Sequence, residues 1–460
     1  MDKYYKSEKF KSKLKGYEDF LESGSLGSLD TDDLCEIAQY FYELKESDKS
    51  LQAINVALEL YPGSVGPLAF RARYALFVNN DPAKADEFAE AIDDKTDPDY
   101  VLLKAEIMIF GNRSDDADRY LEDVYSQTAD YDEHDDMPLD VALLFADYEE
   151  WDLSAKWLKR SDEVEENDYK YVNAEILISK EQYDAGEKII NELLDNDPYS
   201  SDYWDVIIKA KFLSGNFENC ITACDYAIAI NPDDSAAIFN KGNSMYNLGN
   251  YSGAAKQFAN YIKLVPKKDI GYLMLGVTQI AQNRFQEAEQ SLLKALKANL
   301  HDVAYSWQNR ADTYYHLSYI EDVLGHYDLA HQYLDKLEDV YKIYLIDDCE
   351  QLSKSLADLD CAHGLLYLEQ EDIGNAIDWF GQAIIDSNES NDIYIKIAAS
   401  AFECGYVRYS YNILHGLVTE SKKEIDPLGF EYLAKCCKIL GLKEEERWAL
   451  EKAKKSVENK

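Results

Sequence analysis

The chain has 460 residues, 46% of them hydrophobic, and a formal net charge of −41 at pH 7. This hydrophobic content suffices for a packed protein, and the length exceeds what one compact core supports, so several domains or an elongated repeat array is expected. The strongly negative charge repels polyanions, which argues against a nucleic-acid partner.

Residues 1–30 are predicted to form an N-terminal helical cap. This segment has no apolar run of signal-peptide length, and no stretch of the chain reaches the 18 apolar residues of a membrane span. The eight cysteines are sparse and irregularly spaced, which fits a reducing compartment. We therefore expect a cytoplasmic protein that does not associate with a membrane.

Residues 31–166 are predicted to form divergent, acidic helical repeats. One unit runs from Thr31 to Pro62, and further units begin near Val65, Pro98 and Asp135. The acidic loop at 130–136 places carboxylates at alternate positions, but it lacks the glycine and the distal glutamate of a calcium-binding loop. We therefore expect no metal site.

Residues 167–303 carry the clearest repeat. Pro198, Pro232 and Pro266 stand 34 residues apart, and units of two helices begin at 201, 235 and 269. A fixed period of 34 indicates a two-helix unit that buries its apolar face by stacking on copies of itself. Small residues at the eighth and twentieth positions of each unit allow its two helices to approach closely.

The residue types at these positions resemble the tetratricopeptide repeat family. The unit that begins at 235 matches the family pattern in type at Ile238, Gly242, Leu248-Gly249, Tyr251, Ala254, Phe258 and Pro266. The resemblance implies an all-α fold, a right-handed superhelical solenoid of about 12 helix-turn-helix repeats. It also implies that the first helix of each repeat lines a concave groove.

The period is interrupted over residues 304–356, where an irregular repeat with an extended helix is predicted. Its first helix, from Trp307 to Leu324, is about seven residues too long, and residues 338–356 separate it from the next unit. His326 and His331 are five residues apart, the wrong spacing for joint metal ligation from one helix. Residues 357–460 are predicted to form C-terminal repeats and a cap, with units at 357, 391 and 427.

The groove residues follow from the resemblance, which places the second, fifth, ninth and twelfth positions of each unit on the concave face. The helix that begins at Asp269 is apolar on both sides, so a second apolar stripe needs a cover. A segment of a partner, the chain itself or a second copy could supply it. The candidate groove residues are Asp202, Asp205, Phe212, Phe239, Asn243, Tyr246, Ile270, Leu273, Val277 and Ile280.

The sequence indicates binding rather than catalysis. It contains no recognised catalytic or phosphate-binding motif, and the repeats leave no stretch long enough for a separate catalytic domain. We expect no catalytic residues and no cofactor. Residues 81–200 hold 36 acidic against 11 basic residues, which would steer a basic partner to the N-terminal half.

The expected function is therefore a protein-protein interaction scaffold that binds a peptide or a helical segment in the groove. The alternative is a structural or regulatory subunit that self-associates, for example as a homodimer.

Overall fold

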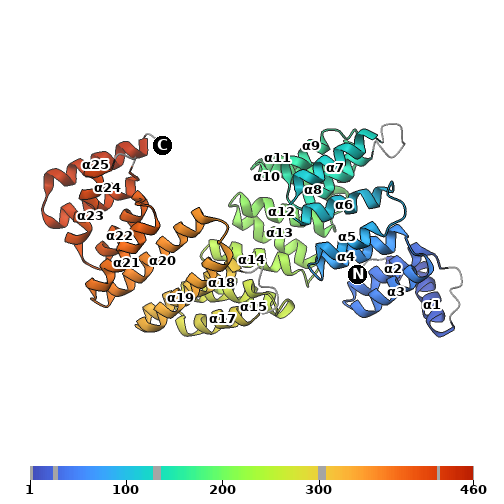
Figure 1. Ribbon diagram of the computed structural model, residues 1–460, viewed down its shortest axis with the longest axis horizontal. Coiled ribbons are helices and arrows are strands. Elements are labelled where there is room, and N and C mark those ends of the chain that lie inside the picture. Colours follow the sequence, from blue (N-terminus) through green and yellow to red (C-terminus); the bar gives the residue numbers. More distant parts are fainter. Residues whose placement is uncertain (1–3, 24–28, 128–135, 299–306, 422–424, 459–460) are drawn as a thin grey trace. The chain divides into compact units, whose positions relative to one another are not determined.

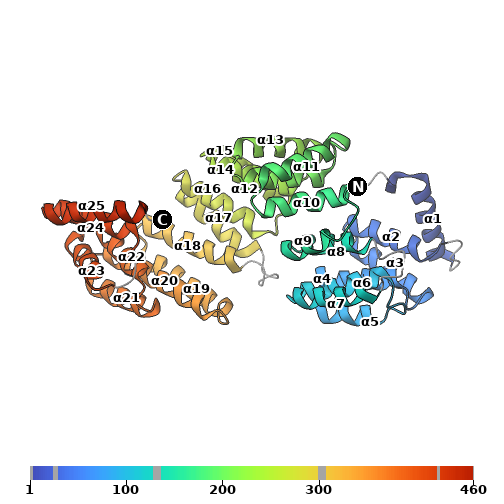
Figure 2. The same ribbon diagram turned by 90° about the horizontal axis from the view of Figure 1, so that it is seen from above.

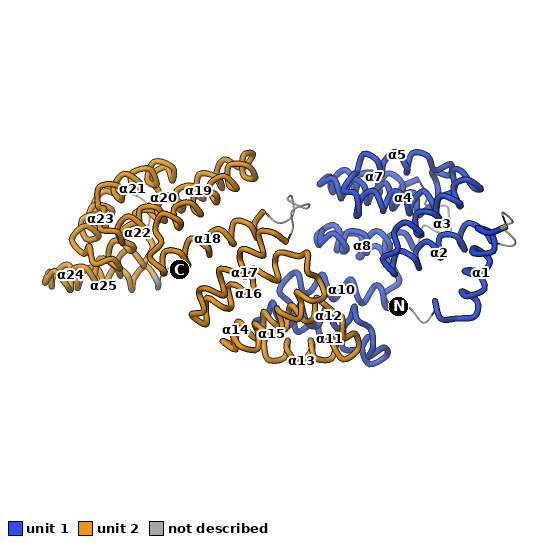
Figure 3. Tube along the Cα trace, turned by 90° about the horizontal axis from the view of Figure 1, so that it is seen from below, with its two compact units in different colours: residues 1–215 blue, residues 216–460 orange. Residues whose placement is uncertain are grey.

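The computed structural model describes residues 4–23, 29–127, 136–298, 307–421 and 425–458. Across these ranges the chain forms α-helices and one short 3₁₀ helix, with no strand (Figures 1 and 2). The all-α prediction is therefore confirmed. The chain divides into two compact units, residues 1–215 (unit 1) and residues 216–460 (unit 2) (Figure 3).

Unit 1 begins with a short 3₁₀ helix and α1, the predicted N-terminal cap helix, and continues as pairs of antiparallel neighbours. Tyr17 and Phe10 of α1 are buried against Leu34 and Ile37 of the next helix, so the cap shares the core of the first repeat. The elements are η1 (Tyr4–Lys6), α1 (Glu8–Ser23), α2 (Thr31–Glu43), α3 (Ser47–Leu60), α4 (Val65–Phe77), α5 (Pro82–Glu90), α6 (Pro98–Phe110), α7 (Ser114–Gln127), α8 (Met137–Asp147), α9 (Trp151–Leu158), α10 (Asn167–Ser179), α11 (Tyr183–Asn196) and α12 (Ser201–Leu213).

Unit 2 continues the same alternation. Each first helix packs on the second helix of its own repeat, and α16, α20 and α22 also pack on the first helix of the next repeat. The elements are α13 (Phe217–Ile230), α14 (Ser235–Asn247), α15 (Tyr251–Leu264), α16 (Asp269–Ala281), α17 (Phe285–Ala298), α18 (Trp307–Val323), α19 (Tyr327–Tyr344), α20 (Cys349–Glu369), α21 (Ile373–Asp386), α22 (Asn391–Glu403), α23 (Val407–Glu420), α24 (Pro427–Leu440) and α25 (Lys443–Glu458).

A residue in the left-handed backbone region marks the turn between the two helices of every repeat. The described residues contain twelve such positions, which supports the predicted count of about 12 units; in the units at 201, 235, 269, 357 and 391 this position is the fifteenth residue. Five are glycines, which adopt positive φ without the steric penalty of a Cβ. The positions are Lys45, Asn80, Asn112, Glu149, Glu181, Gly215, Gly249, Asn283, Gly325, Glu371, Gly405 and Gly441.

Gly249 provides a direct measure of this conformational requirement. Its φ is +74°, and a Cβ added there meets no atom within 4 Å, so the cost of a side chain is backbone strain alone. We expect Gly249→Ala to lower the free energy of unfolding by about 1 kcal/mol in urea denaturation. The matched control is Gly381→Ala inside α21, also in open space. The control should stabilise by up to about 1 kcal/mol. Equal effects at the two glycines would contradict this explanation.

Close contact between the two helices of a repeat depends on glycine at the eighth position. Gly242 of α14 lies against the ring of Phe258 in α15, and Gly276 of α16 lies against Leu292 in α17. Phe258 and Leu292 are fully buried. The predicted role of small residues at this position is therefore confirmed in these repeats.

The irregular repeat differs from its expected form. Within the described residues α18 has 17 residues, against the 13 of α14 and α16. The stretch 338–356, which we expected to separate two units, is mostly helical: it completes the 18-residue α19 and begins the 21-residue α20. The helix expected from 357 thus starts at Cys349. Neither glycine nor proline occurs in 338–356, so nothing local stops either helix early.

Candidate functional site

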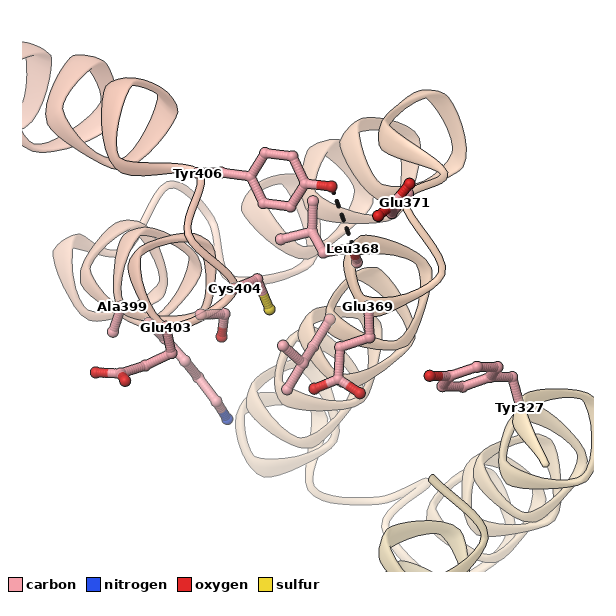
Figure 4. A pocket seen from close by; sticks show the side chains of 11 residues that line it. Tyr327, Leu368, Glu369, Glu371, Ala399, Glu403, Cys404 and Tyr406 are labelled. Carbon is pink, nitrogen blue, oxygen red and sulfur yellow. Dashed lines mark hydrogen bonds between the residues drawn. The ribbon is translucent and has the colours of Figure 1, made fainter. Parts of the chain in front are cut away.

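An open pocket of about 680 Å³ lies on the first-helix face of unit 2 (Figure 4). Leu365 and Leu368 of α20 and Ala399 of α22 form part of its wall. Counted from the left-handed turns, these side chains hold the ninth and twelfth positions of one repeat and the ninth of the next. These are the same repeat positions that define the predicted groove, but they belong to repeats nearer the C-terminus.

Two tyrosines border the pocket. Tyr327 opens α19, and Tyr406 precedes α23 and donates a hydrogen bond of 3.3 Å to the backbone oxygen of Leu368 (Figure 4). That bond ties the loop before α23 to the end of α20. The pocket thus combines aliphatic side chains with aromatic rings that have a fixed anchor on one side.

The polar part of the wall is mostly acidic. It contains Glu369, Glu371 and Glu403, and its one cation, Lys396, pairs with Asp358 at 2.7 Å. Partial burial and the neighbouring carboxyl of Asp322 raise the pKa of Glu369 to about 7. A cationic group placed beside these carboxylates would favour their ionised forms, so the pocket suits a positively charged ligand group.

Cys404 also lines this pocket, but it behaves as a packing residue. Burial raises the pKa of its thiol to about 11, so the reactive thiolate is scarce at neutral pH. The described part of the chain contains no group of three or more His, Cys, Asp or Glu side chains that could hold a metal ion. Most of the acidic loop at 130–136 lies outside the described residues.

The ten predicted groove residues divide between the two units. Asp202 and Asp205 are exposed on α12 of unit 1, which also carries Phe212. The other seven lie on α14 and α16 of unit 2, and none of the ten lines the pocket on α20 and α22. Joint binding by the ten residues stays a prediction.

On α14 the predicted residues pack against the second helix of their own repeat. Phe239 lies 5.6 Å from Phe258 and 4.9 Å from Tyr261, measured between ring centroids. Tyr246 lies 5.3 Å from Tyr251, and Asn243 is half-buried on the same helix. These rings therefore contribute to the repeat interior as well as to its surface.

On α16 the second apolar stripe already has a cover within unit 2. Leu273 is 3% exposed and belongs to a core cluster with Leu317 and Ile320 of α18. Ile270, Val277 and Ile280 are half-buried against the same cluster. The sequence allows three covers for this stripe: a partner segment, the chain itself or a second copy. Leu273 is covered by the chain itself.

The predicted groove residues come from the three central repeats alone, so they do not include the pocket residues. Applied to the units at 357 and 391, the same rule selects Leu365, Leu368 and Ala399. The sequence therefore contained a signal for the aliphatic wall. It contained none for Tyr327, which reaches the pocket from the second helix of the preceding repeat.

A comparison with family models matches residues 239–302 to the tetratricopeptide repeat. The match lies within the stretch in which the sequence shows the clearest period, and residues 239–302 are thus similar to repeats of this family. A comparison with curated proteins gives no match. Among the described helices, none is long and apolar enough to cross a membrane.

Solved structures that resemble the chain include MamA, with 19% identity and a TM-score of 0.32 over 40% of this chain and 95% of MamA. The Cut9-Hcn1 hetero-tetramer of the APC/C gives 14% identity and a TM-score of 0.33, covering 93% of each chain. YrrB, a tetratricopeptide-repeat protein with an unusual peptide-binding site, gives 14% identity and a TM-score of 0.32 over 44% of this chain and 93% of its own.

Proposed function

We propose that this array of tetratricopeptide repeats is a protein-interaction scaffold, which binds a segment of a partner protein on the first-helix face of unit 2. The observation that carries the proposal is the open pocket between α20 and α22, because its aliphatic wall holds groove positions of two consecutive repeats. No catalytic step is part of the proposal.

The partner segment is proposed to carry a Lys or Arg beside aliphatic side chains. Leu365 and Ala399 are partly exposed and offer an apolar surface for the aliphatic part, whereas Glu369 and Glu403 favour the cation. The net charge of −41 adds long-range attraction for a basic partner. The aliphatic side chains of the segment are thus proposed to pack on the apolar wall, and its Lys or Arg to pair with the glutamates of the pocket.

The proposal predicts that filling the pocket abolishes binding. A photo-crosslinking residue at position 399, in the full chain added to native extract, identifies the bound segment, whose synthetic peptide is then titrated by fluorescence anisotropy. We expect Ala399→Trp to weaken peptide binding at least tenfold with an unchanged melting temperature, because the indole occupies the pocket.

Asn412→Trp is the matched control, because Asn412 is exposed on α23, the second helix of the same repeat, and lies outside the pocket. The control should bind as the parent does. Full binding by Ala399→Trp would refute the pocket. A crosslink from position 399 to a second copy of this chain would replace the proposal by self-association, the alternative considered from the sequence.

A further inference from the structure

A chain of hydrogen-bonded side chains joins α19 to α20 beside the pocket. The Nδ1 atoms of His331 on α19 and His363 on α20 are 2.7 Å apart. The Nε2 atom of Gln370 lies 3.3 Å from Nε2 of His331 and 3.0 Å from the backbone oxygen of Leu366. On the other side, Oδ1 of Asp335 lies 3.7 Å from Nε2 of His363.

These contacts determine where each imidazole carries its proton. The Leu366 carbonyl requires the amide nitrogen of Gln370, not its oxygen, so Gln370 also donates to Nε2 of His331. His331 therefore carries its proton on Nδ1 and donates it to Nδ1 of His363. His363 then carries its proton on Nε2, toward Asp335. All the donors in the chain point the same way, and both imidazoles are neutral.

Aromatic rings surround the pair. The rings of His331 and His363 are nearly parallel, with an interplanar angle of 10° and centroids 5.0 Å apart. His363, which is 2% exposed, also stacks on Trp379 of α21 at 4.3 Å, and His331 contacts Tyr367 at 4.4 Å. Water therefore has little access to solvate a charge on His363.

We infer that the His331–His363 pair is an acid-sensitive lock between α19 and α20, which opens when both imidazoles are protonated. One added proton can be accommodated on Nε2 of His331 if Gln370 turns away. A second, on Nδ1 of His363, leaves two N–H groups facing each other across the 2.7 Å contact and two cations side by side, one of them buried.

The direction of the pH effect follows from burial. Burial and the neighbouring His331 lower the pKa of His363 to about 4, and burial lowers that of His331. The carboxylates of Asp335, Asp328 and Asp322 oppose the shift at His331 without cancelling it. Below about pH 6.5 the two histidines therefore bind more protons when the lock is open than when it is closed. The closed lock is favoured near neutral pH and is lost as the pH falls.

The lock acts on the pocket because the two helices that it joins both contribute to the wall. Tyr327 lies on α19, whereas Leu365, Leu368 and Glu369 lie on α20. Separation of the helices removes Tyr327 from the other three. The inference nevertheless concerns the free protein, and it stands or falls whether or not the pocket binds a partner.

Hydrogen exchange of the full chain without a partner tests the lock. Between pH 7.5 and pH 5 we expect the protection factors of the α19 and α20 amides to fall about 30-fold, the proton linkage of one imidazole that titrates near 6.5 when exposed. Amides of α22 and α23 serve as the internal reference. An equal change across unit 2, or no change at α19 and α20, would overturn the inference.

Two further measurements separate the pair from other acid effects. Imidazole ¹⁵N shifts at pH 7.5 should show the Nδ1–H form of His331 and the Nε2–H form of His363, and any other assignment refutes the proposed proton positions. His363→Phe keeps a ring for Trp379 but cannot be protonated there. This variant should lose most of the pH dependence at α19 and α20, whereas His415→Phe, at an exposed position on α23, should retain it.

Discussion

We expect Leu273→Asp to lower the free energy of unfolding by about 4 kcal/mol. Leu273 is 3% exposed and packs with Leu317 and Ile320 of α18, so the substitution both removes a buried aliphatic side chain and places a carboxylate in an apolar cluster. Loss of the side chain alone costs about 2–5 kcal/mol, and an unpaired buried charge adds to that. Urea denaturation followed by circular dichroism measures the effect.

The matched control is Val323→Asp. Val323 lies on α18 next to Leu324, which packs against the same cluster, and it is 45% exposed. Its effect should stay within about 0.5 kcal/mol. Unchanged stability of Leu273→Asp would show that α18 does not cover α16 and would restore Leu273 as an open groove residue. The result therefore decides between a covered and an open stripe at this repeat.

The second large effect is expected at Gly242. A Cβ added there comes within 2.8 Å of Cε1 of Phe258, closer than real contacts allow, and the fully buried ring has no free space to enter. We expect Gly242→Val to lower the free energy of unfolding by about 3 kcal/mol through overpacking between α14 and α15. The urea midpoint measures this loss.

A second substitution tests the cause. Phe258→Leu removes the ring atoms that the new side chain meets, so Gly242→Val should cost less in that background than in the parent. The double-mutant cycle would then show a favourable coupling between the two sites. Strictly additive effects would indicate that Gly242 is needed for its backbone rather than for the close approach.

The sequence predicts the regular repeats well because their stop signals are local. The 34-residue spacing of Pro198, Pro232 and Pro266 places the starts of α12, α14 and α16 at the residues that the structure shows. Each proline follows the end of a second helix by two residues. Thr31, Asn391 and Pro427, framed from weaker patterns, also open helices.

The remaining features depend on contacts that no local pattern encodes. The length of α20 could not be read from 338–356, because a charged stretch without proline or glycine permits either a helix or a linker. The contact between His331 and His363 joins residues 32 positions apart and depends on how α19 and α20 cross. The cover of Leu273 likewise depends on the packing of α18, whose sequence departs from the period.

The turn positions also determine where the gene can gain or lose a repeat without disturbing the rest of the protein. Gly215, Gly249 and Asn283 succeed one another at intervals of 34 residues, so a duplication or deletion of 34 codons there restores the same helix register on both sides. The next intervals, to Gly325 and to Glu371, are longer. An exchange of the same size across them joins mismatched helices, so modular growth of this protein is confined to stretches that keep the 34-residue interval, which returns from Glu371 to Gly405.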